Sequence, residues 1–181
     1  KDHLRDVLAF LARPRTDGLL VTGPTGAGKT SLIRQVAARL NWPVQEVNGH
    51  GRFEFADLLG LWTMVNGNMD FLYGPLSIAV REGHILVINE FDFIEPQELA
   101  ELYTVLDGAS LVIPQKGGEA ISVHPKFRLV FTGNTKGQGD DGLYTGVLQQ
   151  NIALLDRFRV MEVGYMDPAD EERLLARLAG A

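Results

Sequence analysis

The chain contains 181 residues, of which 45% are hydrophobic and 22% charged, and its formal net charge is −6. This composition suits one globular core, and the apolar runs are shorter than the roughly 20 residues that span a bilayer, so membrane insertion is not expected. Because cysteine is absent, disulfides and thiolate metal sites are excluded, and we expect a cytoplasmic protein. The negative charge disfavours nucleic acid as a partner. Lys1 in place of an initial methionine predicts a fragment or a processed form.

Apolar periodicity predicts that strands and helices alternate along the first half of the chain. The expected elements, in order, are an opening helix that ends near Arg13, a buried strand over Gly18–Gly23, a helix with Leu32, Ile33, Val36, Ala37 and Leu40 on one face, a strand over Pro43–Asn48 and a short helix over Phe55–Trp62. Asn66 and Gly67 then supply the turn signature of a β-hairpin, which we place at Thr63–Tyr73.

The second half continues the same alternation. It begins with a helix over Pro75–Arg81, a central parallel strand over His84–Phe91, and a helix from Pro96 with Leu99, Leu102, Tyr103 and Leu106 on one side. A hairpin from Leu111–Pro114 and Glu119–His124 and a strand over Phe127–Thr132 are expected next, and then a glycine-rich loop over 133–142 that leads to a helix ending near Phe158. The last expected elements are a strand over Val160–Tyr165 and a helix that is capped by Asp167 and Pro168, with Leu174, Leu175 and Leu178 inside. Five strands separated by helices predict a three-layer α/β fold, in which a mostly parallel sheet has helices on both faces and two β-hairpin insertions.

A phosphate-binding loop is the strongest motif of the sequence. Gly23 to Thr30 reads Gly-Pro-Thr-Gly-Ala-Gly-Lys-Thr and matches the Walker A pattern at every specified position, with a strand before it and a helix after it. Glycines let the backbone N–H groups surround phosphate oxygens, and the helix N-terminus adds partial positive charge. The alternative is a glycine-rich turn that only joins a strand to a helix. The predicted nucleotide-binding residues are Gly23, Pro24, Thr25, Gly26, Ala27, Gly28, Lys29, Thr30 and Ser31, with Lys29 on the β- and γ-phosphates and the Thr30 hydroxyl on Mg²⁺.

Polar groups at the end of the central strand are the second candidate site. P-loop enzymes need such groups to hold the metal and to activate water, and Glu90 is the expected base, although a solvated Glu/Asp pair is the alternative. Asp92 would project to the same side as Glu90 if the strand continued. Asn89 stands where the pattern expects aspartate, and its uncharged amide should weaken Mg²⁺ binding. Thr30, Asn89 and Glu90 are therefore the expected metal-site residues, and we expect Asn89→Asp to tighten the Mg²⁺ dependence and raise turnover.

Two more polar residues are placed where α/β sheets bind ligands. Asn134 follows a buried strand and could position the lytic water, or it could belong to a simple Asn-Thr turn. Arg157 precedes the last strand, where it could pair with Asp156 or reach the phosphate of a neighbouring subunit as an arginine finger.

Together these motifs resemble the AAA+ ATPases, most of all the branch with MoxR-like proteins, the CbbQ/NorQ activators and the small ATPase subunit of cobaltochelatase. In this resemblance Gly23–Thr30 is Walker A, and Ile85–Asp92 is Walker B with Asn-Glu-Phe-Asp in place of Asp-Glu-x-Asp. Asn134 matches sensor 1, Arg157 matches the arginine finger, and Asn48 matches the residue that switches the catalytic glutamate. The resemblance implies that residues 1–181 form the P-loop large subdomain, with the helical lid and its sensor 2 arginine absent or truncated.

The resemblance also implies a function. Such proteins form hexameric rings that use ATP and Mg²⁺ to remodel a protein partner, often one with a von Willebrand A domain. The hairpins at Thr63–Tyr73 and Leu111–His124 resemble the helix-2 insert and the hairpin before sensor 1, and would face the pore or the partner, or be plain β decoration. ATP as the nucleotide is implied by the family alone. The alternative is a nucleotide-gated assembly scaffold that hydrolyses little because of Asn89, and a DNA-directed motor is disfavoured by the charge.

Overall fold

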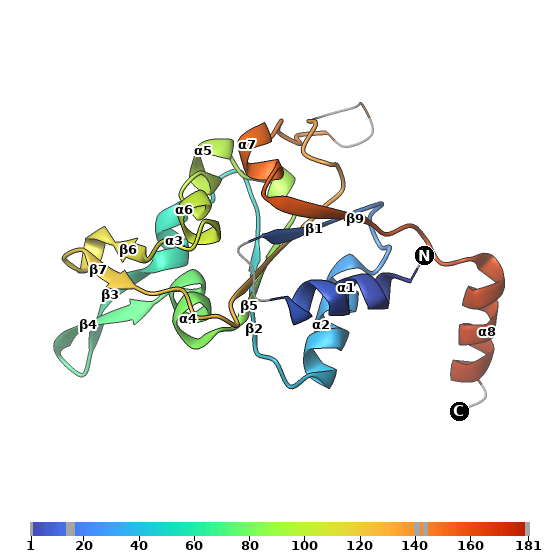
Figure 1. Ribbon diagram of the computed structural model, residues 1–181, viewed down its shortest axis with the longest axis horizontal. Coiled ribbons are helices and arrows are strands. Elements are labelled where there is room, and N and C mark those ends of the chain that lie inside the picture. The colour runs from blue at the N-terminus through green and yellow to red at the C-terminus, as the bar shows by residue number, and fades with distance from the viewer. Residues whose placement is uncertain (1, 14–16, 140–141, 143–144, 180–181) are drawn as a thin grey trace.

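The computed structural model describes residues 2–13, 17–139, 142 and 145–179, and these form an α/β domain whose sheet lies between two groups of helices (Figure 1). The strands of the main sheet are β1 (Gly18–Thr22), β2 (Val44–Asn48), β5 (Ile85–Asn89), β8 (Arg128–Gly133) and β9 (Phe158–Glu162). The helices are α1 (His3–Ala12), α2 (Lys29–Arg39), α3 (Phe55–Leu59), α4 (Pro75–Glu82), α5 (Pro96–Leu99), α6 (Leu102–Leu106), α7 (Ile152–Leu155) and α8 (Pro168–Ala179), with short 3₁₀ turns η1 (Phe91–Phe93) and η2 (Pro114–Lys116).

The five strands are ordered β2-β5-β8-β1-β9, and every neighbouring pair is parallel. The predicted fold class is therefore confirmed, and the sheet is parallel throughout. Asn48 is level with Asn89 across β2 and β5, and Thr22 is level with Gly133 across β1 and β8. The residues that follow these strands consequently meet at one edge of the sheet, where open α/β sheets bind their ligands.

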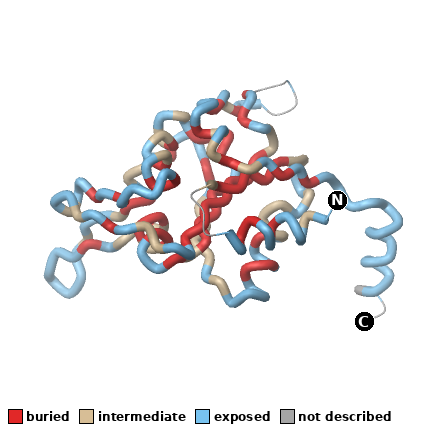
Figure 2. The backbone as a smooth tube through the Cα atoms, in the orientation of Figure 1, coloured by how far each residue is buried: buried red, intermediate tan, exposed pale blue. Residues whose placement is uncertain are grey.

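Strict alternation of side chains along the strands divides the core into two layers. In β5, Ile85 and Val87 pack with α1 and α2, whereas Leu86 and Ile88 pack on the opposite face with residues of α3 to α7. All five residues of β1 and of β5 are buried, as expected for a parallel sheet covered on both sides. Figure 2 shows this burial concentrated along the sheet, while α8 and the hairpin tips are exposed.

The first hairpin consists of β3 (Gly60–Val65) and β4 (Asn68–Tyr73), joined by Asn66 and Gly67. Both turn residues have positive φ, 51° and 84°, which confirms the predicted Asn-Gly turn. The prediction that the preceding helix extends to Trp62 is wrong: α3 ends at Leu59, and Gly60, with φ of 130°, begins the strand. The Trp62 indole N–H donates to the Gln115 carbonyl at 2.9 Å.

The second hairpin consists of β6 (Leu111–Ile113) and β7 (Glu119–Ile121), connected through η2. The bond between Trp62 and Gln115 therefore joins the two hairpins side by side at one end of the molecule (Figure 1). Both predicted hairpins are present, although each strand of the second is shorter than expected.

Several predicted helices differ from the structure. The helix from Pro96 is divided into α5 and α6 by a turn at Ala100 and Glu101, and the helix before the last strand is limited to α7, with Phe158 already in β9. Residues 140–141 of the predicted loop lie outside the described residues. Within the described part of the chain, no helix combines the length and the apolar character needed to cross a membrane.

The closing helix α8 is capped as predicted, since Asp167 Oδ1 accepts a hydrogen bond from the Ala169 N–H at 2.9 Å. The burial predicted for its leucines is wrong, because Leu174 is 45% exposed and Leu175 58% exposed. The side chain of Leu178 lies outside the described residues. The helix extends away from the sheet (Figure 1), so its apolar face is not covered by the five-stranded core.

Candidate nucleotide-binding and hydrolysis site

The phosphate loop borders a cavity of about 420 Å³ at the carboxyl edge of the sheet, lined also by α2 and by the ends of β2, β5 and β8. Gly23 has a φ of 147°, and a Cβ at this position would lie 1.9 Å from the Val163 carbonyl oxygen, so only glycine fits. Gly28 precedes α2 in a left-handed conformation. The loop is thus shaped by its glycines and delivers Lys29 and Thr30 on the first turn of α2.

Lys29 holds the phosphate loop and the predicted sensor together. Its ammonium donates to the carbonyl oxygens of Gly23 at 2.7 Å and Pro24 at 3.0 Å, and to Asn134 Oδ1 at 3.1 Å. The Thr25 hydroxyl also donates to Asn134 Oδ1, at 3.4 Å. Burial lowers the pKa of Lys29 from its ordinary value of 10.5, while the charges of Asp92 and Glu90 oppose this shift. The structure therefore brings together Walker A and the residue predicted as sensor 1.

Asn89 lies in the middle of a second set of hydrogen bonds on the α2 face of the sheet. Its Oδ1 accepts from the hydroxyls of Thr30 at 2.8 Å and Thr132 at 3.0 Å. Its Nδ2 donates to Glu46 Oε1 at 2.8 Å and Asn48 Oδ1 at 3.1 Å. Two of the three predicted metal-site residues, Thr30 and Asn89, are thus in direct contact. Both side chains offer the oxygen ligands that Mg²⁺ favours, but neither carries the negative charge of the carboxylates that commonly bind this ion.

Glu90 follows β5 in a strained conformation. Its φ and ψ are 52° and 43°, a left-handed geometry that is uncommon for a residue with a side chain. The next residue, Phe91, is fully buried, and its ring stacks on Phe131 at a centroid distance of 5.1 Å. Glu90 itself is exposed and lines the cavity. The backbone turn therefore ends the strand at Asn89 and leaves the predicted base in the solvent-accessible part of the site.

Asp92 does not lie where the sequence predicts. Because the strand ends at Asn89, Asp92 turns inward and is fully buried. Its Oδ2 accepts from the backbone N–H groups of Asn134 at 2.9 Å and Thr135 at 3.0 Å, and from the Thr135 hydroxyl at 3.2 Å. Asp92 therefore holds the backbone of Asn134 and Thr135 in place, and the expectation that it projects beside Glu90 is wrong.

Of the remaining two predicted catalytic residues, Asn48 lines the same cavity as Glu90, and Arg157 is not among the described residues that line it. Among the described contacts, the side chain of Asn48 bonds to Asn89 and none joins it to Glu90. Arg157 bonds to Asp107 at 2.9 and 2.8 Å, and to the Ala153 carbonyl at 2.8 Å, and the proposed partner Asp156 receives none of its described hydrogen bonds. The roles of Asn48 as a switch and Arg157 as a finger stay predictions.

Four of the described residues that line the cavity were missed at the sequence level: Arg34, Glu46, Thr132 and Gly133. Arg34 of α2 donates twice to Glu46, and these bonds, with that from Asn89, hold the pKa of Glu46 below its ordinary 4.5 against the effect of partial burial. The signal was the spacing, because Glu46 precedes Asn48 by two residues on β2 and must share its face. Thr132 could have been found in the same way from its place in a buried strand.

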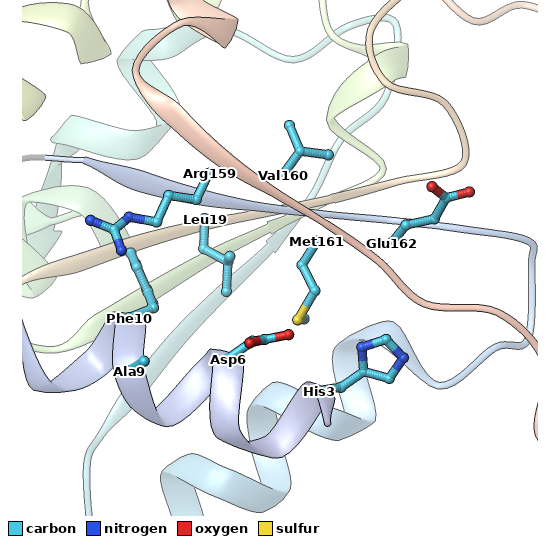
Figure 3. Close-up of a pocket in the computed structure, with 9 residues that line it drawn as sticks. All are labelled: His3, Asp6, Ala9, Phe10, Leu19, Arg159, Val160, Met161 and Glu162. Atoms are coloured by element: carbon cyan, nitrogen blue, oxygen red, sulfur yellow. The ribbon is translucent and has the colours of Figure 1, made fainter. Parts of the chain in front are cut away.

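A second cavity, of about 410 Å³, lies between α1 and the edge strand β9 (Figure 3). Met161 points from the strand towards the helix, where Asp6 faces it, and His3 and Glu162 lie at one end. This cavity shares no lining residue with the phosphate-loop cavity among the described residues. Its lining was not predicted from the sequence.

Comparison with known proteins agrees with this geometry. The AAA domain family, dynein-related subfamily, matches residues 18–158. An uncharacterized protein of Staphylococcus haemolyticus is 36% identical over 154 residues, which cover 82% of this chain and 56% of the relative. The aerobic cobaltochelatase subunit CobS of Sinorhizobium is 35% identical over 171 residues, which cover 92% of this chain and 51% of that protein. The chain thus spans about half the length of these curated relatives.

A solved structure shows the same fold. The crystal structure of a presumed ATPase from Cytophaga hutchinsonii superposes with a TM-score of 0.73 at 17% identity, over 98% of this chain and 49% of the other. The family match runs from the start of β1 to the first residue of β9 and so contains the phosphate loop, Asn89, Glu90, Asn134 and Arg157. These findings confirm the resemblance drawn from the sequence, and the chain belongs to the AAA domain family, in its dynein-related subfamily, as a MoxR-like P-loop ATPase domain.

Proposed function

We propose that this domain binds ATP with Mg²⁺ and hydrolyses it as part of a remodelling ATPase that works as an oligomeric ring on a protein partner. The observation that carries the proposal is the convergence of Lys29, Thr30, Asn89 and Asn134 on one cavity through direct hydrogen bonds. Glu90 lines the same cavity. These are the groups that phosphoryl transfer needs, because its catalysis consists mainly of positioning and of stabilising charge.

Each group has a defined task in this proposal. The backbone N–H groups of the phosphate loop and the Lys29 ammonium bind the phosphates, for which Lys29 exchanges its present carbonyl partners. The Thr30 hydroxyl and the Asn89 amide oxygen would hold Mg²⁺, which supplies Lewis-acid polarisation of the phosphate oxygens when bound. Glu90 accepts a proton from the attacking water, and Asn134 orients that water from the end of β8.

Exposed residues support the assembled form that we propose for the protein. Arg157 is 34% exposed and lies at the surface, where it can reach a neighbouring subunit. The two joined hairpins carry exposed apolar side chains, among them Leu61, Met64 and Leu72, and we assign them to the partner side of a homo-hexamer. The relative CobS is named as a cobaltochelatase subunit, which favours a protein partner, and we include von Willebrand A-domain proteins and a cytoplasmic setting in the proposal.

A nucleotide-gated scaffold is the second candidate. Asn89 is uncharged and buried at 6% exposure, so the domain lacks the aspartate that commonly supports the metal at this place. Weak metal binding would leave nucleotide-dependent assembly intact while hydrolysis is slow.

Steady-state ATP hydrolysis by the intact protein, at concentrations that span assembly, separates the two candidates. We expect turnover that rises with oligomer formation and disappears in Glu90→Gln, which keeps the size of the side chain and removes the base. Tight ATP binding without turnover in the assembled protein would support the scaffold. Failure to bind ATP at all would reject both.

A further inference from the structure

The orientation of the Asn89 amide is determined by its neighbours. Glu46 carries a carboxylate that can only accept hydrogen bonds when ionised, so the group that faces it at 2.8 Å must be the Nδ2 donor of Asn89. The hydroxyls of Thr30 and Thr132 can donate, and they do so to Oδ1. The amide oxygen is therefore directed at Thr30, the residue expected to bind the metal, because Glu46 binds the amide nitrogen.

Glu46 also brings a negative charge to the site. Its side chain is 24% exposed, lines the phosphate-loop cavity, and is oriented by two hydrogen bonds from Arg34 at 2.7 and 2.5 Å. Arg34 is 59% exposed, so water screens its charge more than that of Glu46. The carboxylate expected at position 89 is thus absent, and one from the adjacent strand lies within a single hydrogen bond of that position.

We infer that Glu46 is a positioning residue of the metal site: it orients the Asn89 oxygen and supplies, from β2, the negative charge that Walker B normally contributes from β5. The inference rests on the proposed function, since it assumes that Mg²⁺ binds at Thr30 with the nucleotide. The pair of Glu46 and Asn89 carries together the single negative charge that an aspartate would carry alone.

This arrangement reverses an expectation from the sequence. In Asn89→Asp, a carboxylate oxygen would face Glu46 Oε1 where the Nδ2 donor now lies at 2.8 Å. Two carboxylates at this distance repel each other, and neither can donate a hydrogen bond. The single substitution should therefore destabilise the site instead of improving it. In the double exchange, Glu46→Gln with Asn89→Asp, the glutamine amide can donate a hydrogen bond and the aspartate carboxylate can accept it. The pair then again carries one negative charge.

The test is the Mg²⁺ dependence of nucleotide binding, measured with the fluorescent analogue mant-ATP on the intact protein in the absence and presence of MgCl₂. Glu46→Gln can still accept from Asn89 and from Arg34 Nη2 through its amide oxygen, so it removes the charge and one of the two bonds from Arg34 while it keeps the acceptor for Asn89. We expect the Mg²⁺ concentration for half-maximal binding to rise about 10- to 100-fold, as for other groups that orient metal ligands. The double exchange should return it close to the wild-type value. Glu82→Gln is the matched control, because Glu82 is an exposed partner of Arg81 outside the cavity.

Each result bears on the inference. A merely structural role of Glu46 would weaken mant-ATP binding equally with and without Mg²⁺, and that outcome would overturn the inference, as would a double exchange no better than Glu46→Gln. Asn89→Asp should have a lower thermal unfolding midpoint than the double exchange. If Asn89→Asp does not fold, the Mg²⁺ dependence of Glu46→Gln and of the double exchange still tests whether Glu46 supports the metal site. Wild-type protein that binds no mant-ATP would reject the proposed function, and the inference with it. Mg²⁺-dependent binding that is unchanged in Glu46→Gln would reject the inference alone.

Discussion

Arg157 and Asp107 form a bidentate ion pair that links the end of α7 to the end of α6. Arg157 Nε donates to Asp107 Oδ1 at 2.9 Å and Nη2 donates to Oδ2 at 2.8 Å, while the guanidinium lies over the Tyr103 ring at 5.2 Å. An arginine finger must leave such a pair before it can reach a neighbour's phosphate. The partially exposed location of the pair makes this exchange feasible, because water screens exposed ion pairs.

The first prediction concerns this exchange. Arg157→Ala should lower ATP hydrolysis by about 10³-fold or more in the assembled protein, the range known for arginine fingers, and should leave mant-ATP binding by the dilute protein unchanged. Hydrolysis is measured across the concentration range of assembly. Asp107→Asn is the control, since it removes the charge of the partner and keeps Arg157, and it should not reduce hydrolysis. Full activity of assembled Arg157→Ala would remove the finger assignment.

The second prediction concerns pH. The hydrogen bonds from Arg157 hold the pKa of Asp107 below its ordinary 3.8 in the folded protein. An acid with a lowered folded-state pKa binds protons more readily when unfolded, so it contributes stability above the unfolded pKa and loses it as the pH falls through the folded pKa. The difference in unfolding free energy between wild type and Asp107→Asn should be constant at neutral pH and shrink below the ordinary pKa. Urea unfolding at stepped pH measures it, and a difference that grows in acid would contradict the prediction.

The third prediction concerns the support of the loop at residues 134–135 by Asp92. Asp92→Ala would leave the part-buried N–H groups of Asn134 and Thr135 without their acceptor. An unsatisfied buried donor costs about 1–3 kcal/mol, and water can reach part-buried donors, so we expect a loss of about 1–2 kcal/mol in urea unfolding and weaker mant-ATP binding. Asp92→Asn keeps one acceptor oxygen, so its unfolding free energy should lie between those of the wild type and Asp92→Ala. Equal stability of wild type and Asp92→Ala would show that the loop is held by other contacts.

The fourth prediction concerns the joint between the hairpins. Trp62→Phe keeps an aromatic ring against Phe71, which Trp62 meets edge-on at 5.5 Å, and loses the hydrogen bond to Gln115. Amide hydrogen exchange in β6 and β7 should become faster, by an amount that corresponds to a loss of about 1 kcal/mol in the free energy of local opening. Nucleotide binding should be unchanged. Trp42→Phe is the matched control, because the Trp42 indole bonds to the Gly83 carbonyl at 2.8 Å, away from the hairpins. Unchanged exchange in Trp62→Phe would show that the hairpins are held by packing alone.

Much of the fold could be predicted from the sequence because its signals are local. Buried parallel strands read as continuous apolar runs, the Asn66-Gly67 turn requires positive φ, and Walker A joins a strand to a helix at fixed spacing. The convergence of Lys29 and Asn134 follows from the rule that open α/β sheets bind ligands at the carboxyl ends of their strands, whereas the order of the strands was not predicted.

What the sequence did not predict depends on contacts between distant residues or on backbone geometry. Asp92 turns inward because Glu90 adopts a left-handed conformation, which no residue pattern indicates. The Arg157 partner lies 50 residues away in the chain, and a local search offered Asp156 instead. Periodicity correctly predicted an apolar face on α8, but a periodic pattern does not say what covers that face, and Leu175 is exposed.

The two ends of the β3–β4 hairpin lie next to each other where they join the rest of the domain. The Gly74 N–H donates to the Leu59 carbonyl at 2.8 Å, so the residues on either side of the hairpin are already hydrogen-bonded neighbours. Replacement of the exposed tip, residues 64–69, would therefore change the surface of the domain while Phe71 keeps its place in the core beside α3 and α4. The surface of this segment can thus vary independently of the sheet that carries the phosphate loop, which makes it the position at which an engineered recognition element should be grafted.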